Sequence, residues 1–300
     1  MPDLSVVIVT YNSEGDIRGC LDSVYKTAGG LDVEVFVVDN ASTDGTVEAV
    51  RQGYPNVMLI ENDYNAGFPA ANNQALRLAR GRYMMLLNPD TVVHPGALET
   101  IVRFMDDHPD CGICAPRLQD QNGNEAPDLR RPTFGYYLAC FVGVRGLMAK
   151  HLPARKLEMV SGACMALRRE VLDEVGLLDE DLFWCEDLDY CTRAVAKGWR
   201  VCVATDARVT HFVGRSAKSN LALVLEKQYS STLGYFHKHA SGPEFRRLVR
   251  LFVLEAWVRM VKWRVKAIAC KSEEARLRAK TFRRLVREIP SYARRLSRDR

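Results

Sequence analysis

Short apolar runs alternate with longer amphipathic segments through the first hundred residues, and this alternation restricts the fold most. The runs at 4–12, 33–40, 56–62 and 82–90 are nearly continuous in apolar residues, as expected of strands buried on both faces. The segments between them carry apolar residues at helical spacing. Strands that alternate with helices need right-handed crossovers, so we predict a mostly parallel α/β sheet flanked by helices.

Polar residues close three of these runs, which end in TYN, DNAS and NPD. The carboxyl ends of parallel strands lie at one edge of a sheet, and ligands of open α/β sheets bind there. A simple turn would explain NPD by itself, but it would not explain why TYN and DNAS also stand at the ends of predicted strands. We therefore expect Asp90 to share a ligand-binding edge with Asp39 and Thr10.

The chain lacks the glycine-rich loops that bind phosphate directly. No GxGxxG follows the first strand, and no GxxxxGK[ST] occurs. A phosphate-bearing ligand would then need a cation, and Mg²⁺ or Mn²⁺ commonly bridges carboxylates to substrate phosphates. Asp90 could supply such a carboxylate. A lone histidine such as His211 is usually structural, and it would be a ligand only if Asp90 lies nearby.

The pattern loosens after residue 110. We interpret the aromatic and glycine-rich segment 131–146 as core or as an acceptor-facing loop, in preference to a membrane-touching face. Residues 160–176 indicate a strand that runs into a helix, and 186–198 indicate another helix. Residues 199–211 read as a pair of strands that ends on His211.

An acidic segment begins the helix predicted at residue 186. Glu186 and Asp187 could be ordinary acids of a helix start, favoured by the helix dipole. They also follow the apolar residues Phe183 and Trp184. A carboxylate beside these rings would be partly desolvated, which raises its pKa toward use as a general base.

Cysteine usage and hydropathy favour a cytoplasmic protein. The nine cysteines form no framework and mostly lie in apolar strings, so we expect them to be reduced core residues. The CGIC sequence at 111–114 has no second pair, which argues against a zinc site. We find neither a signal peptide pattern nor an uncharged apolar run long enough to span a membrane.

The C-terminal region is strongly basic. Residues 240–300 contain 18 Lys/Arg and 6 Asp/Glu, whereas the preceding residues contain 24 and 31. Apolar residues at helical spacing from Leu248 onward predict one helix, and a second should run from Glu273 to Glu288 and stop at Pro290. The pair could pack on the rest of the chain with a solvated basic face, or bind an anionic membrane surface. Nucleic acid is disfavoured as a partner, because no aromatic stacking surface is evident.

Seven motifs occur together in one order: VVIVTYN, VVDNASTDGT, NAGFPAANN, LLNPDTVV, SGACMALRRE, FWCEDLDYCTR and HFVGRS. In that order and spacing the chain resembles the family-2 glycosyltransferases of the GT-A fold, and most of all the bacterial rhamnosyltransferase-like group. The resemblance covers about residues 4–216. It implies an inverting transfer of a sugar from a nucleotide-diphosphate donor.

The resemblance also implies a role for each matching residue. Metal motifs of this fold commonly read Asp-x-Asp, whereas Asn88 occupies the first position here. With a single carboxylate, the site would bind metal more weakly. The implied roles are as follows: Thr10, Asn12 and Asp39 hold the nucleoside; Asn65 and Gly67 line the donor pocket; Asp90 binds a divalent cation (Mg²⁺ or Mn²⁺), with His211 as second ligand; Asp187 is the base; and Glu186 helps to hold the acceptor.

We expect a GT-A catalytic domain over 1–240 and a basic helical tail over 241–300. Deoxythymidine-diphosphate rhamnose is the first choice of donor, and another nucleotide sugar such as a uridine-diphosphate sugar is the alternative. The acceptor would be a bacterial cell-surface glycan precursor on a lipid carrier, reached at the inner face of the cell membrane. A nucleotidyltransferase and an inactive membrane-surface module are the alternatives from other classes. Linkage position and oligomeric state are not evident from the sequence.

Overall fold

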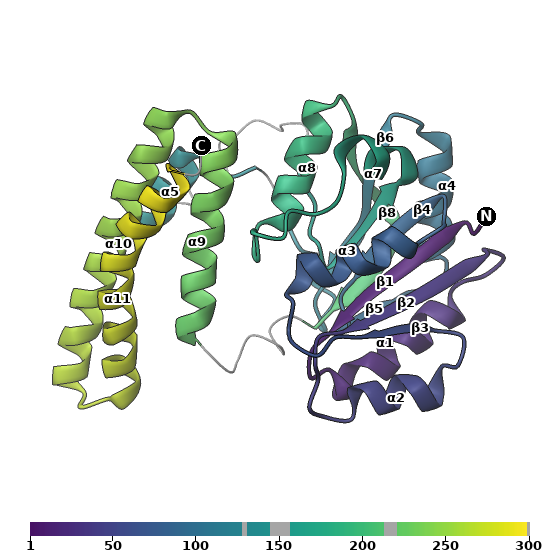
Figure 1. Cartoon of the computed structure of the whole chain (residues 1–300), viewed down its shortest axis with the longest axis horizontal. Helices are drawn as coiled ribbons and strands as arrows, with labels where there is room; N and C mark the ends of the chain where they lie inside the picture. Colours follow the sequence, from purple (N-terminus) through teal and green to yellow (C-terminus); the bar gives the residue numbers. More distant parts are fainter. Residues whose placement is uncertain (128–130, 145–156, 213–220, 299–300) are drawn as a thin grey trace. The chain divides into compact units, whose positions relative to one another are not determined.

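The computed structural model describes residues 1–127, 131–144, 157–212 and 221–298. They belong to two compact units (Figure 1). The first unit comprises Met1–Arg131, Lys156–Glu180 and Glu186–Lys218, and the second comprises Pro132–Arg155, Asp181–Cys185 and Ser219–Arg300.

The first unit is built on a mixed sheet, which has eight strands in the described part of the chain, in the order β3-β2-β1-β4-β7-β6-β8-β5. Strands β1 to β4 run parallel, as predicted. Strand β7 is antiparallel to β4 and β6, β8 is parallel to β6, and β5 is antiparallel to β8. The strands are β1 (Leu4–Thr10), β2 (Val33–Asp39), β3 (Met58–Glu61), β4 (Tyr83–Leu87), β5 (Thr91–Val93), β6 (Cys111–Gln119), β7 (Cys164–Arg168) and β8 (Arg200–His211).

Helices cover both faces of this sheet (Figure 1). Every residue of β1 and β4 is buried, which explains why their sequences are apolar without alternation. The helices of the first unit are α1 (Glu14–Lys26), α2 (Thr46–Gly53), α3 (Phe68–Leu78), α4 (Ala97–Asp107), α7 (Arg169–Val175) and α8 (Glu186–Ala196).

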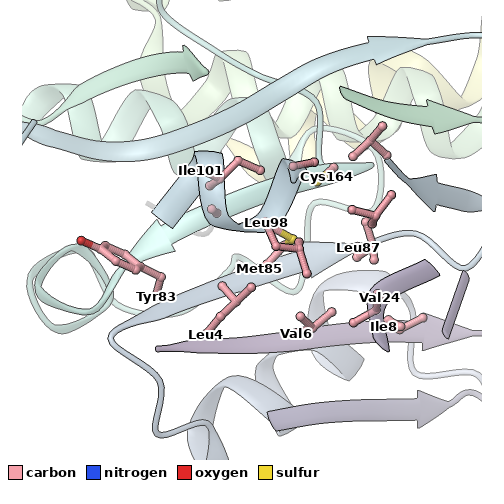
Figure 2. Packing of buried hydrophobic residues seen from close by; sticks show 14 of the residues in the cluster. Leu4, Val6, Ile8, Val24, Tyr83, Met85, Leu87, Leu98, Ile101 and Cys164 are labelled. Carbon is pink, nitrogen blue, oxygen red and sulfur yellow. The ribbon is translucent and has the colours of Figure 1, made fainter. Parts of the chain in front are cut away.

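One hydrophobic core lies under helices α1, α2 and α4. Alternate residues of β1 and β4, among them Val6 and Met85, point toward Val24 of α1 and Leu98 of α4 (Figure 2). Helix α3 packs on β1 and β2. Parallel pairing places the carboxyl ends of β1, β2 and β4 at one edge of the sheet.

The second unit is helical in the part that the structure describes. It contains α5 (Phe134–Phe141), α9 (Leu221–His239), α10 (Gly242–Ala269) and α11 (Glu273–Leu296). Helix α11 packs along α10 and against α9. Tyr137 of α5 makes edge contacts with Phe236 of α9 and Phe252 of α10. No helix in the described ranges has both the length and the apolar character needed to cross a bilayer.

Two predictions of element bounds were wrong. Helix α11 does not stop at Pro290 but continues to Leu296. A helical proline loses one hydrogen bond, but Ile289 and Ala293 on either side of it are buried, and their packing carries the helix through. Residues 199–211 do not form two strands: Arg200–His211 is the single strand β8, and a register shift opposite Pro116 and Arg117 accommodates the polar residues in its middle.

The segment 131–146, expected as core or as an acceptor-facing loop, contains α5 at Phe134–Phe141, and residues 145 and 146 lie outside the described part. Helix α9, which precedes residue 240, packs with α10 and α11 in the second unit. The division into a catalytic domain over 1–240 and a tail over 241–300 is a functional assignment and stays a prediction.

Candidate functional site

Thr10 and Asp39 end the neighbouring strands β1 and β2 and are register partners. The Thr10 hydroxyl donates a hydrogen bond to Asp39 Oδ1 at 2.8 Å. The backbone N–H of Ser42 donates to Asp39 Oδ2 at 2.8 Å, and the Ser42 hydroxyl also donates to Oδ1. Asp39 is therefore a buried carboxylate held by three donors, with little freedom to move.

Asn12 ties the turn after β1 to the turn after β2. Its backbone lies in the left-handed region, with a φ of 53°, which asparagine tolerates better than most residues. Its side-chain oxygen accepts from the Thr43 N–H at 2.8 Å, and its own N–H donates to the Ser42 hydroxyl at 2.8 Å. The two turns thus form one hydrogen-bonded platform at the sheet edge.

Asn65 and Gly67 form a tight turn before α3. The exposed Asn65 accepts from the Gly67 N–H at 3.0 Å. Gly67 has a φ of 87°, a conformation that favours glycine. The buried Asn40 donates to the Gly67 carbonyl at 3.4 Å and accepts from Asn62 at 3.0 Å. Asn40 therefore connects this turn to the end of β2.

Asp90 and His211 lie side by side, which fulfils the condition set for His211 as a ligand. The structure places His211 Nε2 3.2 Å from Asp90 Oδ1 and 3.5 Å from Asn88 Nδ2. Pairing of β5 with β8 produces this proximity, since Thr91 is the register partner of His211. The N–H of Phe212 also donates to the Asp90 carbonyl at 2.9 Å.

This pair fits a divalent cation. Adjacent ligands of an octahedral Mg²⁺ with bonds of about 2.1 Å lie about 3 Å apart, close to the separation of Oδ1 and Nε2. Across the described ranges, no cluster of three or more His, Cys, Asp or Glu side chains could hold a metal. A cation at Asp90 and His211 would therefore take its other ligands from substrate phosphates and water.

Glu186 and Asp187 begin helix α8, as predicted. Asp187 Oδ2 accepts from the Gly162 N–H at 3.0 Å, and Oδ1 accepts from the Leu188 N–H at 2.6 Å. Burial raises the pKa of Asp187 despite these two bonds. Burial also raises the pKa of Glu186 well above its ordinary value, and the neighbouring Asp187 charge raises it further. Glu186 Oε2 is buried without a hydrogen-bond partner among the described residues.

The residues that directly precede β7 connect this carboxylate pair to the Asn88-Pro89-Asp90 turn. Ala163 accepts a hydrogen bond from the Asn88 N–H at 2.9 Å, and the preceding Gly162 donates to Asp187. Two consecutive residues, which directly precede β7, thus fix the predicted metal turn on one side and the predicted base on the other.

An apolar groove of about 460 Å³ opens beside His211 in the first unit. His211 and Ser161 line it, and Ser161 directly precedes Gly162. Much of its wall is apolar, with contributions from Leu118, Ala126, Leu157, Met159 and Val160.

The structure brings the predicted residues together in three groups. The first group is Thr10, Asn12 and Asp39 with the Asn65–Gly67 turn, the second is Asp90 with His211, and the third is Glu186 with Asp187. Their roles stay predictions. Ser42, Asn40 and Gly162 were missed as parts of the site, although they lie in the quoted motifs DNAS and SGAC. Burial raises both carboxyl pKa values as expected. The rings predicted to cause this, Phe183 and Trp184, are themselves 37% and 41% exposed.

Comparison with known proteins supports the fold and the class of protein. The model of the family described as "Glycosyl transferase family 2" matches residues 5–176. The N-acetylglucosaminyl-diphospho-decaprenol L-rhamnosyltransferase of Mycobacterium tuberculosis is 26% identical over 269 residues, which cover 80% of this chain and 85% of the relative.

Two solved structures have a similar fold. The mannosyltransferase PcManGT from Pyrobaculum calidifontis, in complex with GDP-Man and Mn²⁺, matches 95% of this chain and 85% of its own, with a TM-score of 0.60 and 20% identity. TarS from S. aureus, in complex with UDP, matches 96% of this chain and 91% of its own, with a TM-score of 0.56 and 20% identity. The predicted α/β GT-A fold with C-terminal helices is confirmed.

Proposed function

Because the chain belongs to glycosyl transferase family 2, we propose that it transfers a sugar, with inversion, from a nucleotide-diphosphate donor to a hydroxyl group of a cell-surface glycan precursor. One observation carries this proposal. Gly162 and Ala163 hold a carboxylate of raised pKa and the Asn88-Pro89-Asp90 turn at adjacent backbone positions. An inverting transfer needs a base for the acceptor and charge stabilisation for the leaving diphosphate.

The donor nucleoside binds on the platform of Thr10, Asn12 and Asp39. A carboxylate fixed by three donors can accept a hydrogen bond from the nucleoside without reorganising, which favours binding. Asn65 and Gly67 line the donor pocket.

Asp90 and His211 would hold the divalent cation, Mg²⁺ or Mn²⁺. When bound there, the cation supplies Lewis-acid stabilisation of the charge that develops on the departing diphosphate. The Mn²⁺ in the solved mannosyltransferase complex supports this assignment. His211 would be the second protein ligand, in place of the carboxylate that an aspartate at position 88 would supply.

Asp187 acts as the base. It takes the proton of the acceptor hydroxyl while the acceptor oxygen bonds to the anomeric carbon, and the nucleotide diphosphate leaves with the electron pair. No covalent intermediate with the enzyme is needed. Because burial raises its pKa, the carboxylate is a stronger base than an exposed aspartate. Glu186 Oε2, which lacks a partner among the described residues, can accept a hydrogen bond from the acceptor.

The first choice of donor is deoxythymidine-diphosphate rhamnose; the name of the mycobacterial relative supports rhamnose as the sugar. A uridine-diphosphate sugar is the alternative. The same name supports an acceptor on a polyprenyl diphosphate carrier, which would place the protein at the inner face of a bacterial membrane. The groove lined by His211 and Ser161 is the proposed acceptor site, because His211 belongs to the proposed metal pair and Ser161 directly precedes Gly162, which bonds to Asp187.

A donor screen tests the proposal. The full chain is incubated with Mn²⁺ and a series of nucleotide sugars, and nucleotide release is measured with and without a soluble acceptor analogue. Acceptor-dependent release from one donor class, absent in Asp187→Asn, is the expected result. If no donor in the series releases nucleotide with Mn²⁺ or Mg²⁺, the proposal is wrong.

A further inference from the structure

An apolar stripe runs along the exposed side of α10. Its members are 38% to 78% exposed, although each is aliphatic or aromatic. Apart from the adjacent Trp257 and Val258, they recur every three or four residues and therefore share one side of the helix. The buried residues of α10, such as Phe245, Phe252 and Ala256, occupy the other side. The stripe consists of Leu254, Trp257, Val258, Val261, Val265 and Ile268.

A cationic pocket adjoins the C-terminal end of this stripe. Helices α10 and α11 and the turn between them enclose about 550 Å³, and Ile268 belongs to both stripe and pocket. No carboxylate lines the pocket, and its cations form no ion pair within the part of the chain that the structure describes. The five cations are Arg264, Lys271, Arg276, Lys280 and Arg283.

Two other cations of α11 are paired with carboxylates. Arg278 pairs with Glu274 at 2.8 Å, and Arg284 pairs with Glu288 and with Glu226. The charge of these paired arginines is largely neutralised at the surface. The pocket gathers five cations that have no carboxylate partner among the described residues.

Lys271 occupies a position that suits glycine better. It lies in the turn between α10 and α11 with a φ of 47°, in the left-handed region. A non-glycine residue there costs local stability. The chain nevertheless places a charged side chain at this point of the pocket.

We propose that the apolar stripe and the cationic pocket together bind the surface of an anionic lipid bilayer. The stripe would lie at the boundary between headgroups and acyl chains, and a lipid phosphate would occupy the pocket. A second copy of this chain fits less well, because symmetric pairing through the stripe would bring like charges together. The inference rests on the second unit alone and does not depend on the proposed transfer reaction.

Cosedimentation of the full chain with vesicles tests this surface. The vesicles contain phosphatidylcholine alone, or phosphatidylcholine and phosphatidylglycerol in equal parts. We expect binding at low salt to the anionic vesicles only, and weaker binding as salt rises. Trp257 fluorescence should shift to the blue on binding, and Trp257→Phe should remove that shift.

Matched variants distinguish vesicle binding through the pocket from attraction by the basic surface in general. Lys280→Gln should weaken vesicle binding about fivefold, equivalent to about 1 kcal/mol per cation near the surface. Arg284→Gln removes the same charge from a paired residue and should change binding little. Lys271→Gly should weaken binding without lowering the melting temperature. Val265→Ser with Ile268→Ser should weaken binding while all five cations remain.

Four results would overturn the proposal. The first is no binding to anionic vesicles at low salt. The second is equal loss of binding in Lys280→Gln and Arg284→Gln. The third is complete displacement by inorganic phosphate, which would indicate a site for a soluble ligand. The fourth is a vesicle-free dimer that Val265→Ser with Ile268→Ser dissociates, which would make the stripe an interface between copies.

Discussion

The backbone N–H of Gly162 donates a hydrogen bond to Oδ2 of Asp187 at 3.0 Å. The next residue, Ala163, accepts from the N–H of Asn88. The proposed base and the proposed metal turn are therefore fixed by one short piece of backbone that directly precedes β7. Their relative position depends on strand pairing within the first unit, since Cys164 of β7 is the register partner of Leu87 of β4.

Loss of the Asp90 carboxylate should abolish metal-dependent turnover. Asp90→Asn keeps the shape of the side chain but removes its charge, and we expect activity to fall more than about 10²-fold because metal stabilisation contributes several kcal/mol. His211→Gln should raise the Mn²⁺ concentration needed for half-maximal rate. Activity is measured as nucleotide release over a Mn²⁺ series, and the fold is checked by thermal melting.

His94→Gln is the matched control for the metal pair. His94 lies beside the same strands but bonds to Thr210 at 2.8 Å, so its replacement should leave the Mn²⁺ dependence unchanged. Full activity of the parent protein in EDTA, together with full activity of Asp90→Asn, would contradict the metal assignment.

Ser42 should support donor binding through Asp39. Ser42→Ala removes the hydroxyl that donates to Asp39 and that accepts from the Asn12 N–H. We expect a higher KM for the donor with little change in kcat, and a stability loss of about 1 kcal/mol for the lost bonds. Ser230→Ala is the control, because the hydroxyl of Ser230 bonds to the Lys227 carbonyl of its own helix. Equal donor KM values in Ser42→Ala and the parent would refute this role.

Much of this site could be predicted from the sequence, because its residues follow strands that are recognisable as apolar runs. Thr10, Asp39 and Asp90 close three such runs, and parallel pairing brings them to one edge. The Gly162–Asp187 contact could not be predicted in this way. It depends on β7 entering the sheet antiparallel between β4 and β6, and strand order is not encoded in local periodicity.

The sequence pattern also could not predict which face of α10 is exposed. Leu251 and Phe252 share the apolar spacing of Val258 and Ile268 in the sequence, yet the first two are buried and the last two exposed. A helix that is apolar on more than one side does not indicate which side packs. Only the placement of α9 and α11 decides this.

Glu186 should lower stability at neutral pH. Because burial raises its pKa in the folded state, the folded protein binds more protons than the unfolded chain between the ordinary carboxyl pKa and the raised one. The free energy of unfolding therefore falls as pH rises through that window. Glu186→Gln should raise the melting temperature at neutral pH, and the gain should shrink toward acid pH, where Glu186 is protonated in the parent.

Thermal melts of the parent and Glu186→Gln across a pH series measure this effect. Glu288→Gln, at a glutamate of the second unit that pairs with Arg284, is the control and should show no such gain. A constant difference between Glu186→Gln and the parent at every pH would show that Glu186 does not titrate as argued.

Asp187→Asn tests the central claim most directly. The amide keeps the size of the side chain but cannot take the acceptor proton, so we expect the transfer rate to fall roughly 10²–10⁴-fold. Donor affinity, measured by titration calorimetry with the nucleotide product, should hardly change, because Asp39 and Thr10 hold the nucleoside. In the parent, the rate should rise with pH through the raised pKa of Asp187, and this limb should be absent from the residual activity of the variant. Normal turnover by Asp187→Asn, with loss of turnover in Glu186→Gln, would contradict the account and assign the base to the neighbouring residue.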